Sequence, residues 1–198
     1  MTNTGVSDKP QITLASSSPR RRELLDQIQV SYNVLPVDID ESYVPGETAE
    51  QFVTRLALEK ARSGYKTSPL MPALGSDTIV LFDHQILGKP KNRQDALNML
   101  QMLSGKNHQV MTAVAICNGE TEHCVISASE VEFAQIDDQQ AEAYWETGEP
   151  VDKAGGYGIQ GIAAQFIKNI KGSYSGIMGL PLYETVELLK RVGIKNLK

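Results

Sequence analysis

The chain has 198 residues, of which 41% are hydrophobic, and its formal net charge at pH 7 is −5. This length allows one sizeable core or two small lobes, with one domain the simpler expectation. The negative charge argues against general electrostatic binding to nucleic acid or to a membrane surface. No apolar run is long enough to span a membrane, and residues 1–10 are polar without a signal-peptide pattern. We therefore expect a cytoplasmic protein with a disordered tail over residues 1–10 and a single domain over residues 11–198.

Helix and strand patterns alternate along the chain, and several neighbouring strands form hairpins. Strands are predicted over residues 11–15, 30–37, 73–82 and 109–117, in a long strand that returns through Phe133, and around residues 165–170. Helices are predicted to begin near residues 19, 48, 92, 137 and 181. The helix after the capping-box pattern of Thr48 and Gln51 is expected to end near Ser63, and the last helix is expected to bury Leu182, Val186 and Leu189. Asn118-Gly119 is typical of a hairpin turn, and the flanking Cys117 and Cys124 are expected to be reduced thiols. The pattern predicts an α/β fold with a mixed, partly antiparallel twisted sheet flanked by helices.

A turn of three serines precedes the first helix. Ser18 suits the N-cap, and Pro19 suits the first helical position. Three arginines, Arg20–Arg22, then occupy the first turn, where the helix dipole favours acidic residues. Backbone N–H groups, hydroxyls and guanidinium groups at one helix start suit a polyanion such as phosphate. The alternative is a solvated basic turn in which the serines act only as caps.

Two acidic positions are candidates for chemistry. Asp77 lies inside an otherwise apolar strand, where an unpartnered carboxylate would cost several kcal/mol. Metal binding, proton transfer or a structural hydrogen bond would each explain it. Asp40-Glu41 follows a predicted strand and could join Asp77 around a hard divalent cation, or it could form a solvated acidic turn.

Three further positions could contact a nucleotide. Lys60 falls on the polar side of a predicted helix and could also be an ordinary polar-face lysine. Lys89 lies at a strand end before Pro90, which could aim the ammonium group of Lys89 at a phosphate; Lys89 could equally be an edge-strand charge. Residues 152–161 are rich in glycine, and the Gln160 amide offers a donor and an acceptor for a base edge. The alternative for this segment is a flexible surface loop. Together the candidates favour metal-assisted attack of water on a nucleoside triphosphate.

Other kinds of chemistry find little support. The histidines His84, His108 and His123 show no metal-ligand spacing and are expected to be structural or exposed. No serine or cysteine lies in a recognisable nucleophile turn, and no glycine-rich dinucleotide or Walker-type motif is present.

These segments resemble the Maf family of nucleoside triphosphate pyrophosphatases, from about Ile12 to Gly193. The motifs that carry the resemblance are Leu14–Arg21, Arg55-Leu56-Ala57 with Glu59-Lys60-Ala61, Gly75–Thr78, Lys89-Pro90, Leu103–Gly105, Asp152–Gly155 with Tyr157–Gly161, and Gly179-Leu180-Pro181. One departure is Ser17, where relatives often have glycine.

The resemblance implies a fold like that of inosine triphosphate pyrophosphatases, with two lobes around a nucleotide cleft. It also implies a homodimer, a divalent cation (Mg, Mn or Co), and cleavage to nucleoside monophosphate and pyrophosphate. By matching positions, Asp77 is expected to activate water or bind the metal, and Glu41 to act as a metal-binding or catalytic carboxylate. Ser16, Arg21, Lys60 and Lys89 are expected to hold the triphosphate, and Arg20, Thr78 and Gln160 to set base selectivity.

The strand Met111–Val114 and the loop Tyr157–Gly161 resemble the branch of the family that acts on dTTP and UTP. Modified pyrimidine nucleotides are a possible extension of that substrate class. One alternative is a pyrophosphatase for 7-methyl-GTP or another modified nucleotide. Another is a nucleotide-sensing regulator of cell division that restrains septum formation.

Overall fold

The computed structural model describes residues 10–196, which divide into two compact units. The first unit comprises the chain up to Asp77, residues 113–126 and the chain from Gly179; the second comprises residues 78–112 and 127–178. Apart from Pro10, the predicted tail lies outside the described residues. No helix among residues 10–196 is long and apolar enough to cross a membrane.

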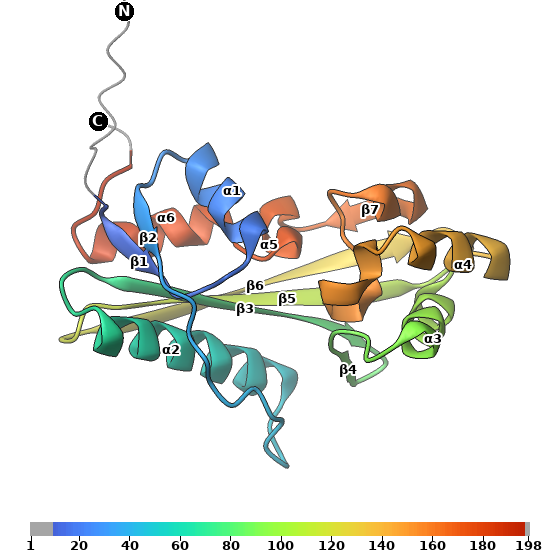
Figure 1. The fold of residues 1–198 in the computed structure, drawn as a ribbon, viewed down its shortest axis with the longest axis horizontal. Helices are drawn as coiled ribbons and strands as arrows, with labels where there is room; N and C mark the ends of the chain where they lie inside the picture. Colours follow the sequence, from blue (N-terminus) through green and yellow to red (C-terminus); the bar gives the residue numbers. More distant parts are fainter. Residues whose placement is uncertain (1–9, 197–198) are drawn as a thin grey trace, which may run out of the picture. The chain divides into compact units, whose positions relative to one another are not determined.

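The strands form one mixed sheet. They are β1 (Ile12–Leu14), β2 (Tyr32–Val34), β3 (Ala73–Phe82), β4 (Gln85–Leu87), β5 (Asn107–Cys117), β6 (Glu122–Phe133) and β7 (Ile167–Lys171). Their order is β2-β1-β3-β5-β6-β7, and β4 pairs with β3. β1 pairs in parallel with β2 and with β3, where Thr13 lies opposite Ala73, whereas β3–β4 and β6–β7 are antiparallel. The expected α/β class with a mixed sheet and flanking helices is confirmed (Figure 1).

Five of the helices within residues 10–196 begin close to their predicted positions, and one, over Tyr174–Met178, was not predicted. The helices are α1 (Pro19–Gln27), α2 (Ala49–Thr67), α3 (Arg93–Leu103), α4 (Asp138–Glu146), α5 (Tyr174–Met178) and α6 (Leu182–Arg191), with 3₁₀ turns η1 (Glu149–Asp152), η2 (Ala154–Gly156) and η3 (Ile162–Phe166). Thr48 and Gln51 form the predicted capping box at the start of α2. The carboxylate of Asp137 caps α4 in the same way.

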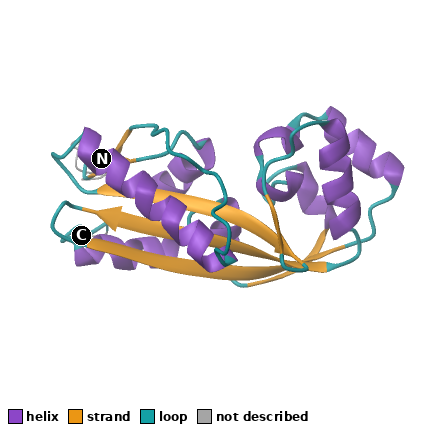
Figure 2. Ribbon diagram, turned by 90° about the horizontal axis from the view of Figure 1, so that it is seen from below, coloured by secondary structure: helices purple, strands orange, loops and turns teal. Residues whose placement is uncertain are grey.

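In the first unit, α2 covers one face of the strands, and α1 and α6 cover the other (Figures 1 and 2). Two glycines let α2 approach the strands closely. A Cβ atom on Gly75 of β3 would lie 2.4 Å from the carbonyl oxygen of Ala57, and one on Gly64 would lie 2.8 Å from the Cβ of Ala15. α2 continues past the buried Gly64 to Thr67 and does not end near Ser63 as predicted.

The second unit has its own core, built from β4, β7, parts of β3, β5 and β6, and the helices α3 and α4. Its buried side chains include Leu100, Leu103, Phe133, Tyr144 and Phe166. This core holds in place the glycine-rich segment that follows α4.

Two details of the prediction are wrong. The strand expected over residues 30–37 is limited to Tyr32–Val34, and two of its three residues are exposed. The buried residues of α6 are Thr185, Leu188 and Leu189, where the sequence pattern indicated Leu182, Val186 and Leu189. Cys117 and Cys124 are free thiols, as expected.

Candidate functional site

In the first unit, the carboxylates of Asp77 and Glu41 both contact the ammonium group of Lys60. The Nζ atom of Lys60 lies 2.6 Å from Oδ1 of Asp77 and 2.7 Å from Oε1 of Glu41. Lys60 and Asp77 are each 8% exposed. Lys60 is therefore not the ordinary polar-face lysine that its helical position suggested. The structure brings three candidates, far apart in sequence, into direct contact.

The local packing explains this contact. Because Gly75 lacks a side chain, the α2 backbone around Ala57 and Ala61 lies directly against β3. Lys60 belongs to this contacting stretch of the helix. Alternate residues of a strand share a face, so Asp77 points to the same side of β3 as Gly75. The Gly75-Ser76-Asp77 sequence thus provides both the space for the helix and the partner for its lysine.

The middle residue of this sequence points to the opposite side of the strand. The hydroxyl of Ser76 is fully buried and lies 2.9 Å from the carbonyl oxygens of both Ala113 and Gly179. This contact ties the centre of β3 to the chain segment just before α6. Nothing in the sequence pattern beyond the motif itself indicated a structural role for Ser76.

The serine turn is organised around Arg21. Its Nε donates to the carbonyl oxygen of Gly179 at 2.9 Å, and its Nη1 donates to Oγ of Ser16 at 2.9 Å. The same Ser16 oxygen accepts the backbone N–H of Ser18. Ser18 occupies the N-cap position, but its side chain makes no capping hydrogen bond, contrary to the prediction. Ser16 fixes the turn instead.

Charge interactions link Arg21 to the carboxylates. Burial lowers the pKa of Arg21; the charge of Asp77 opposes this change and that of Arg20 adds to it. Glu41 also opposes it. The guanidinium stays protonated, because arginine titrates far above neutral pH. The first unit therefore gathers two arginines, Lys60 and two carboxylates in one charged region.

The second unit contains the candidates Thr78, Lys89 and Gln160. Thr112 donates its hydroxyl proton to the carbonyl oxygen of Gly176 at 2.7 Å and lies 2.9 Å from the hydroxyl of Thr78. Since Thr112 has a single proton, Thr78 must be the donor in their shared hydrogen bond. The hydroxyl oxygen of Thr78 can therefore still accept a hydrogen bond from another group. Lys89 is exposed and follows β4, just before the buried Pro90.

Gln160 is exposed on a loop that is fixed by Glu149. The Glu149 carboxylate accepts hydrogen bonds from the Tyr144 hydroxyl at 2.8 Å, from Ile162 N–H at 2.8 Å and from Ala163 N–H at 3.3 Å. Burial favours a raised pKa for Glu149, but these hydrogen bonds outweigh burial and lower it. Residues 155–159 of the glycine-rich segment are themselves buried, so the segment differs from the exposed surface loop of the alternative.

The carboxylates beside Lys60 can hold a divalent cation only together with other ligands. Among residues 10–196 there is no group of three or more His, Cys, Asp or Glu side chains that could hold a metal ion. However, Mg²⁺ is usually held by one or two carboxylates, with substrate phosphates and water completing the shell. Glu41 and Asp77 supply two hard oxygen ligands beside one another, so they fit a cation that arrives with a phosphorylated ligand.

The fold and these clusters define an α/β protein whose basic and acidic side chains suit a phosphorylated ligand. The chain matches the Maf family model, described as Maf-like protein, over residues 11–192, and it belongs to this family. The resemblance seen in the sequence motifs is thereby confirmed.

Curated relatives match most of the chain. It is 51% identical over 189 residues to the dTTP/UTP pyrophosphatase of Pseudoalteromonas atlantica, covering 93% of this chain and 98% of that protein. It is 50% identical over 187 residues to the dTTP/UTP pyrophosphatase of Alkalilimnicola ehrlichii, covering 91% and 92%. Among solved structures, the Ham1 protein of Staphylococcus aureus aligns with a TM-score of 0.44 and 16% identity, over 63% of this chain and 72% of that chain.

Sequence reasoning missed several residues that organise these clusters. Ser76 and Thr112 lie in strands, where a buried hydroxyl resembles an ordinary core position. Glu149 could have been suspected, because it is an acidic residue at the start of a glycine-rich segment. Arg55 belongs to a motif quoted for the family resemblance, but its position on the helix gave no indication of its partners.

Proposed function

We propose that this protein hydrolyses nucleoside triphosphates, chiefly dTTP and UTP, to the nucleoside monophosphate and pyrophosphate. The observation that carries the proposal is the contact of Lys60 with both Asp77 and Glu41. It is supported by the names of relatives that match nearly their whole length.

In the proposed reaction, water attacks the α-phosphorus and the bond to the β-phosphate oxygen breaks, which releases pyrophosphate. Asp77 is proposed either to accept the proton of the attacking water or to serve as a metal ligand, and both roles require its carboxylate. Lys60 holds Asp77 and Glu41 in position through two of its three ammonium donors, so the third can serve a phosphate oxygen. A positive charge there stabilises the negative charge that develops in the transition state.

A divalent cation is part of this proposal. Glu41 and Asp77 would hold it, and when bound it would neutralise phosphate charge and favour water attack. Ser16, Arg21 and Lys89 are proposed to bind the triphosphate. Arg21 is already oriented by the carbonyl oxygen of Gly179, so little side-chain entropy is lost when it binds.

Base selectivity is proposed to depend on Arg20, Thr78 and Gln160. Thymine and uracil present an N3–H donor between two carbonyl acceptors. A hydroxyl oxygen that acts as an acceptor, as at Thr78, and an amide that can both donate and accept, as at Gln160, match this edge. Cytosine has no N3–H donor and fits such a set less well.

The proposal is tested by measuring pyrophosphate release from a panel of nucleoside triphosphates, including 7-methyl-GTP, with and without Mg²⁺ or Mn²⁺. Metal-dependent release that favours dTTP and UTP is expected. A preference for 7-methyl-GTP would overturn the substrate assignment. Nucleotide binding without any release would overturn the enzymatic proposal in favour of a regulatory one.

We also propose a cytoplasmic homodimer, as the family resemblance implies. Light scattering of the purified chain tests the dimer directly. A mass near 21.7 kDa in solution would contradict it.

A further inference from the structure

Glu41 lies on a long loop that has no helix or strand of its own. Residues 35–48 connect β2 to α2, and most of them are exposed. The Glu41 side chain itself is 53% exposed, in contrast to the 10% of Lys60. An exposed carboxylate on such a loop needs other contacts to keep its place beside a buried ammonium group.

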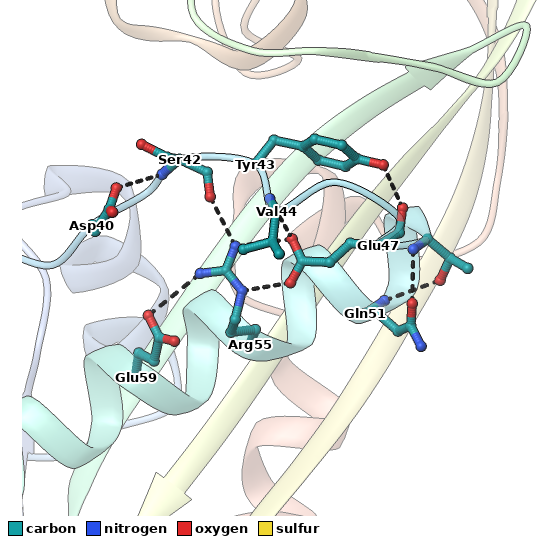
Figure 3. Close-up of polar contacts among 9 residues, drawn as sticks. Asp40, Ser42, Tyr43, Val44, Glu47, Gln51, Arg55 and Glu59 are labelled. Carbon is teal, nitrogen blue, oxygen red and sulfur yellow. Dashed lines mark hydrogen bonds and ion pairs between the residues drawn. The ribbon is translucent and has the colours of Figure 1, made fainter.

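Arg55 of α2 supplies these contacts, as Figure 3 shows. Its Nε and Nη2 atoms donate to the two carboxylate oxygens of Glu47 at 2.5 and 3.0 Å. Nη2 also donates to the carbonyl oxygen of Ser42 at 2.9 Å, one residue after Glu41. Glu59, one turn further along α2, lies 3.5 Å from Nη1. A single guanidinium group therefore joins the helix to both ends of the segment 42–47.

Glu47 extends this arrangement into the loop. Its Oε2 atom accepts the backbone N–H of Val44 at 3.1 Å, and its carbonyl oxygen accepts the hydroxyl of Tyr43 at 2.6 Å (Figure 3). The side chains of Arg55 and Glu47 are only 23% and 13% exposed. Their hydrogen bond is the largest cause of a raised pKa for Arg55 and a lowered pKa for Glu47. Both groups are therefore charged at neutral pH.

Arg55 and Lys60 point to different sides of the same helix. Five residues along an α-helix correspond to a rotation of about 140°. One side of α2 carries Lys60, which contacts Asp77. Another side carries Arg55, which contacts the loop at Ser42. The helix thus sets the position of the loop that carries Glu41 relative to the ammonium group that Glu41 contacts.

We propose that Arg55 is a positioning residue that holds Glu41 in register with Lys60 and Asp77. The expected effect of Arg55 on kcat rests on the proposed function. The contact of Arg55 with the loop can be tested without measuring activity. A bidentate pair with a carboxylate requires the planar fork of arginine, so lysine is expected to replace Arg55 only in part.

Hydrogen exchange tests the contact. In Arg55→Gln we expect faster exchange across residues 40–47, while the amides of α2 beyond its first turn keep their protection. The matched control is Arg62→Gln, because Arg62 lies on the same helix and makes an equivalent bidentate pair with Glu122. Unchanged exchange in residues 40–47 would overturn the proposal, whether or not the protein hydrolyses nucleotides.

Pyrophosphate release tests the consequence. We expect Arg55→Gln to lower kcat about 10- to 100-fold, Arg55→Lys to lower it less, and Arg62→Gln to leave it unchanged. If Arg55 acts through Glu41, adding Arg55→Gln to Glu41→Gln should cost less than about twofold more. Losses that multiply in the double variant would show that Arg55 acts elsewhere. If the wild-type protein releases no pyrophosphate, the proposed function fails, and the exchange result alone decides the role of Arg55.

Discussion

The ammonium group of Lys60 lies 2.6 Å from the carboxylate of Asp77, and both residues are 8% exposed. A buried ion pair contributes little net stability compared with well-packed apolar side chains. The carboxylate of Asp77 in the middle of an apolar strand is therefore better explained by a role in the reaction than by a contribution to folding stability. The first two predictions separate these contributions.

Replacing Asp77 by asparagine keeps the size of the side chain and an oxygen that can accept from Lys60. The carboxylate is lost, so we expect pyrophosphate release to fall about 10²- to 10⁴-fold while nucleotide binding, measured by calorimetry with a non-hydrolysable analogue, largely survives. Asp83→Asn is the control, since Asp83 is an exposed residue in the turn that ends the same strand. Full turnover in Asp77→Asn would exclude both roles proposed for this residue.

Replacing Lys60 by methionine tests stability. The change leaves the buried carboxylate of Asp77 without its cation and close to the negative charge of Glu41. We expect the free energy of unfolding in urea to fall by about 3–5 kcal/mol. Lys66→Met, at the exposed end of the same helix, should change it by no more than about 0.5 kcal/mol. Equal losses in the two variants would show that the buried ion pair matters no more to the free energy of unfolding than an exposed lysine does.

Replacing Gln160 by alanine tests base selectivity. The side chain is exposed on a loop whose backbone Glu149 holds in place, so its removal should leave the loop intact. We expect the ratio of kcat/KM for dTTP to that for dCTP to fall about tenfold or more, with a smaller effect on kcat for dTTP. Gln165→Ala, a nearby exposed glutamine, serves as the control. An unchanged ratio would remove Gln160 from the selectivity argument.

His108 makes the stability of the protein depend on pH. It is buried in the second unit, its Nε2 atom lies 2.7 Å from the Tyr157 hydroxyl, and the ring packs edge-on against Phe133. Burial lowers the pKa of His108 from 6.5 to about 4. Between these pH values the unfolded chain binds the proton and the folded chain does not, so stability is full above pH 6.5 and decreases as the pH falls towards 4.

The two pKa values of His108 correspond to a loss of about 3 kcal/mol over this range. Urea unfolding of the wild type and of His108→Gln at several pH values measures it. We expect the wild type to lose more stability than the variant between pH 6.5 and pH 4. Parallel curves for the two proteins would contradict this prediction.

The sequence by itself determined the local structure well, because its signals are local. The capping residues Thr48, Asn92 and Asp137 placed three helix starts, since a cap and its backbone partner are three residues apart. Asp77 was identifiable as a candidate because a carboxylate is out of place in an apolar strand. The motifs also indicated the family.

Tertiary structure alone decided which of these residues meet. Lys60 looked like a surface lysine, because helical periodicity gives the side of a helix on which a residue lies but not what covers that side. Its burial follows from the space that Gly75 leaves for α2 against β3. The contacts of Arg55 with Ser42 and Glu47 depend on the path of an irregular loop, which no periodic pattern describes. Long-range contacts of this kind form only when the whole chain packs, so they cannot be derived from local sequence preferences.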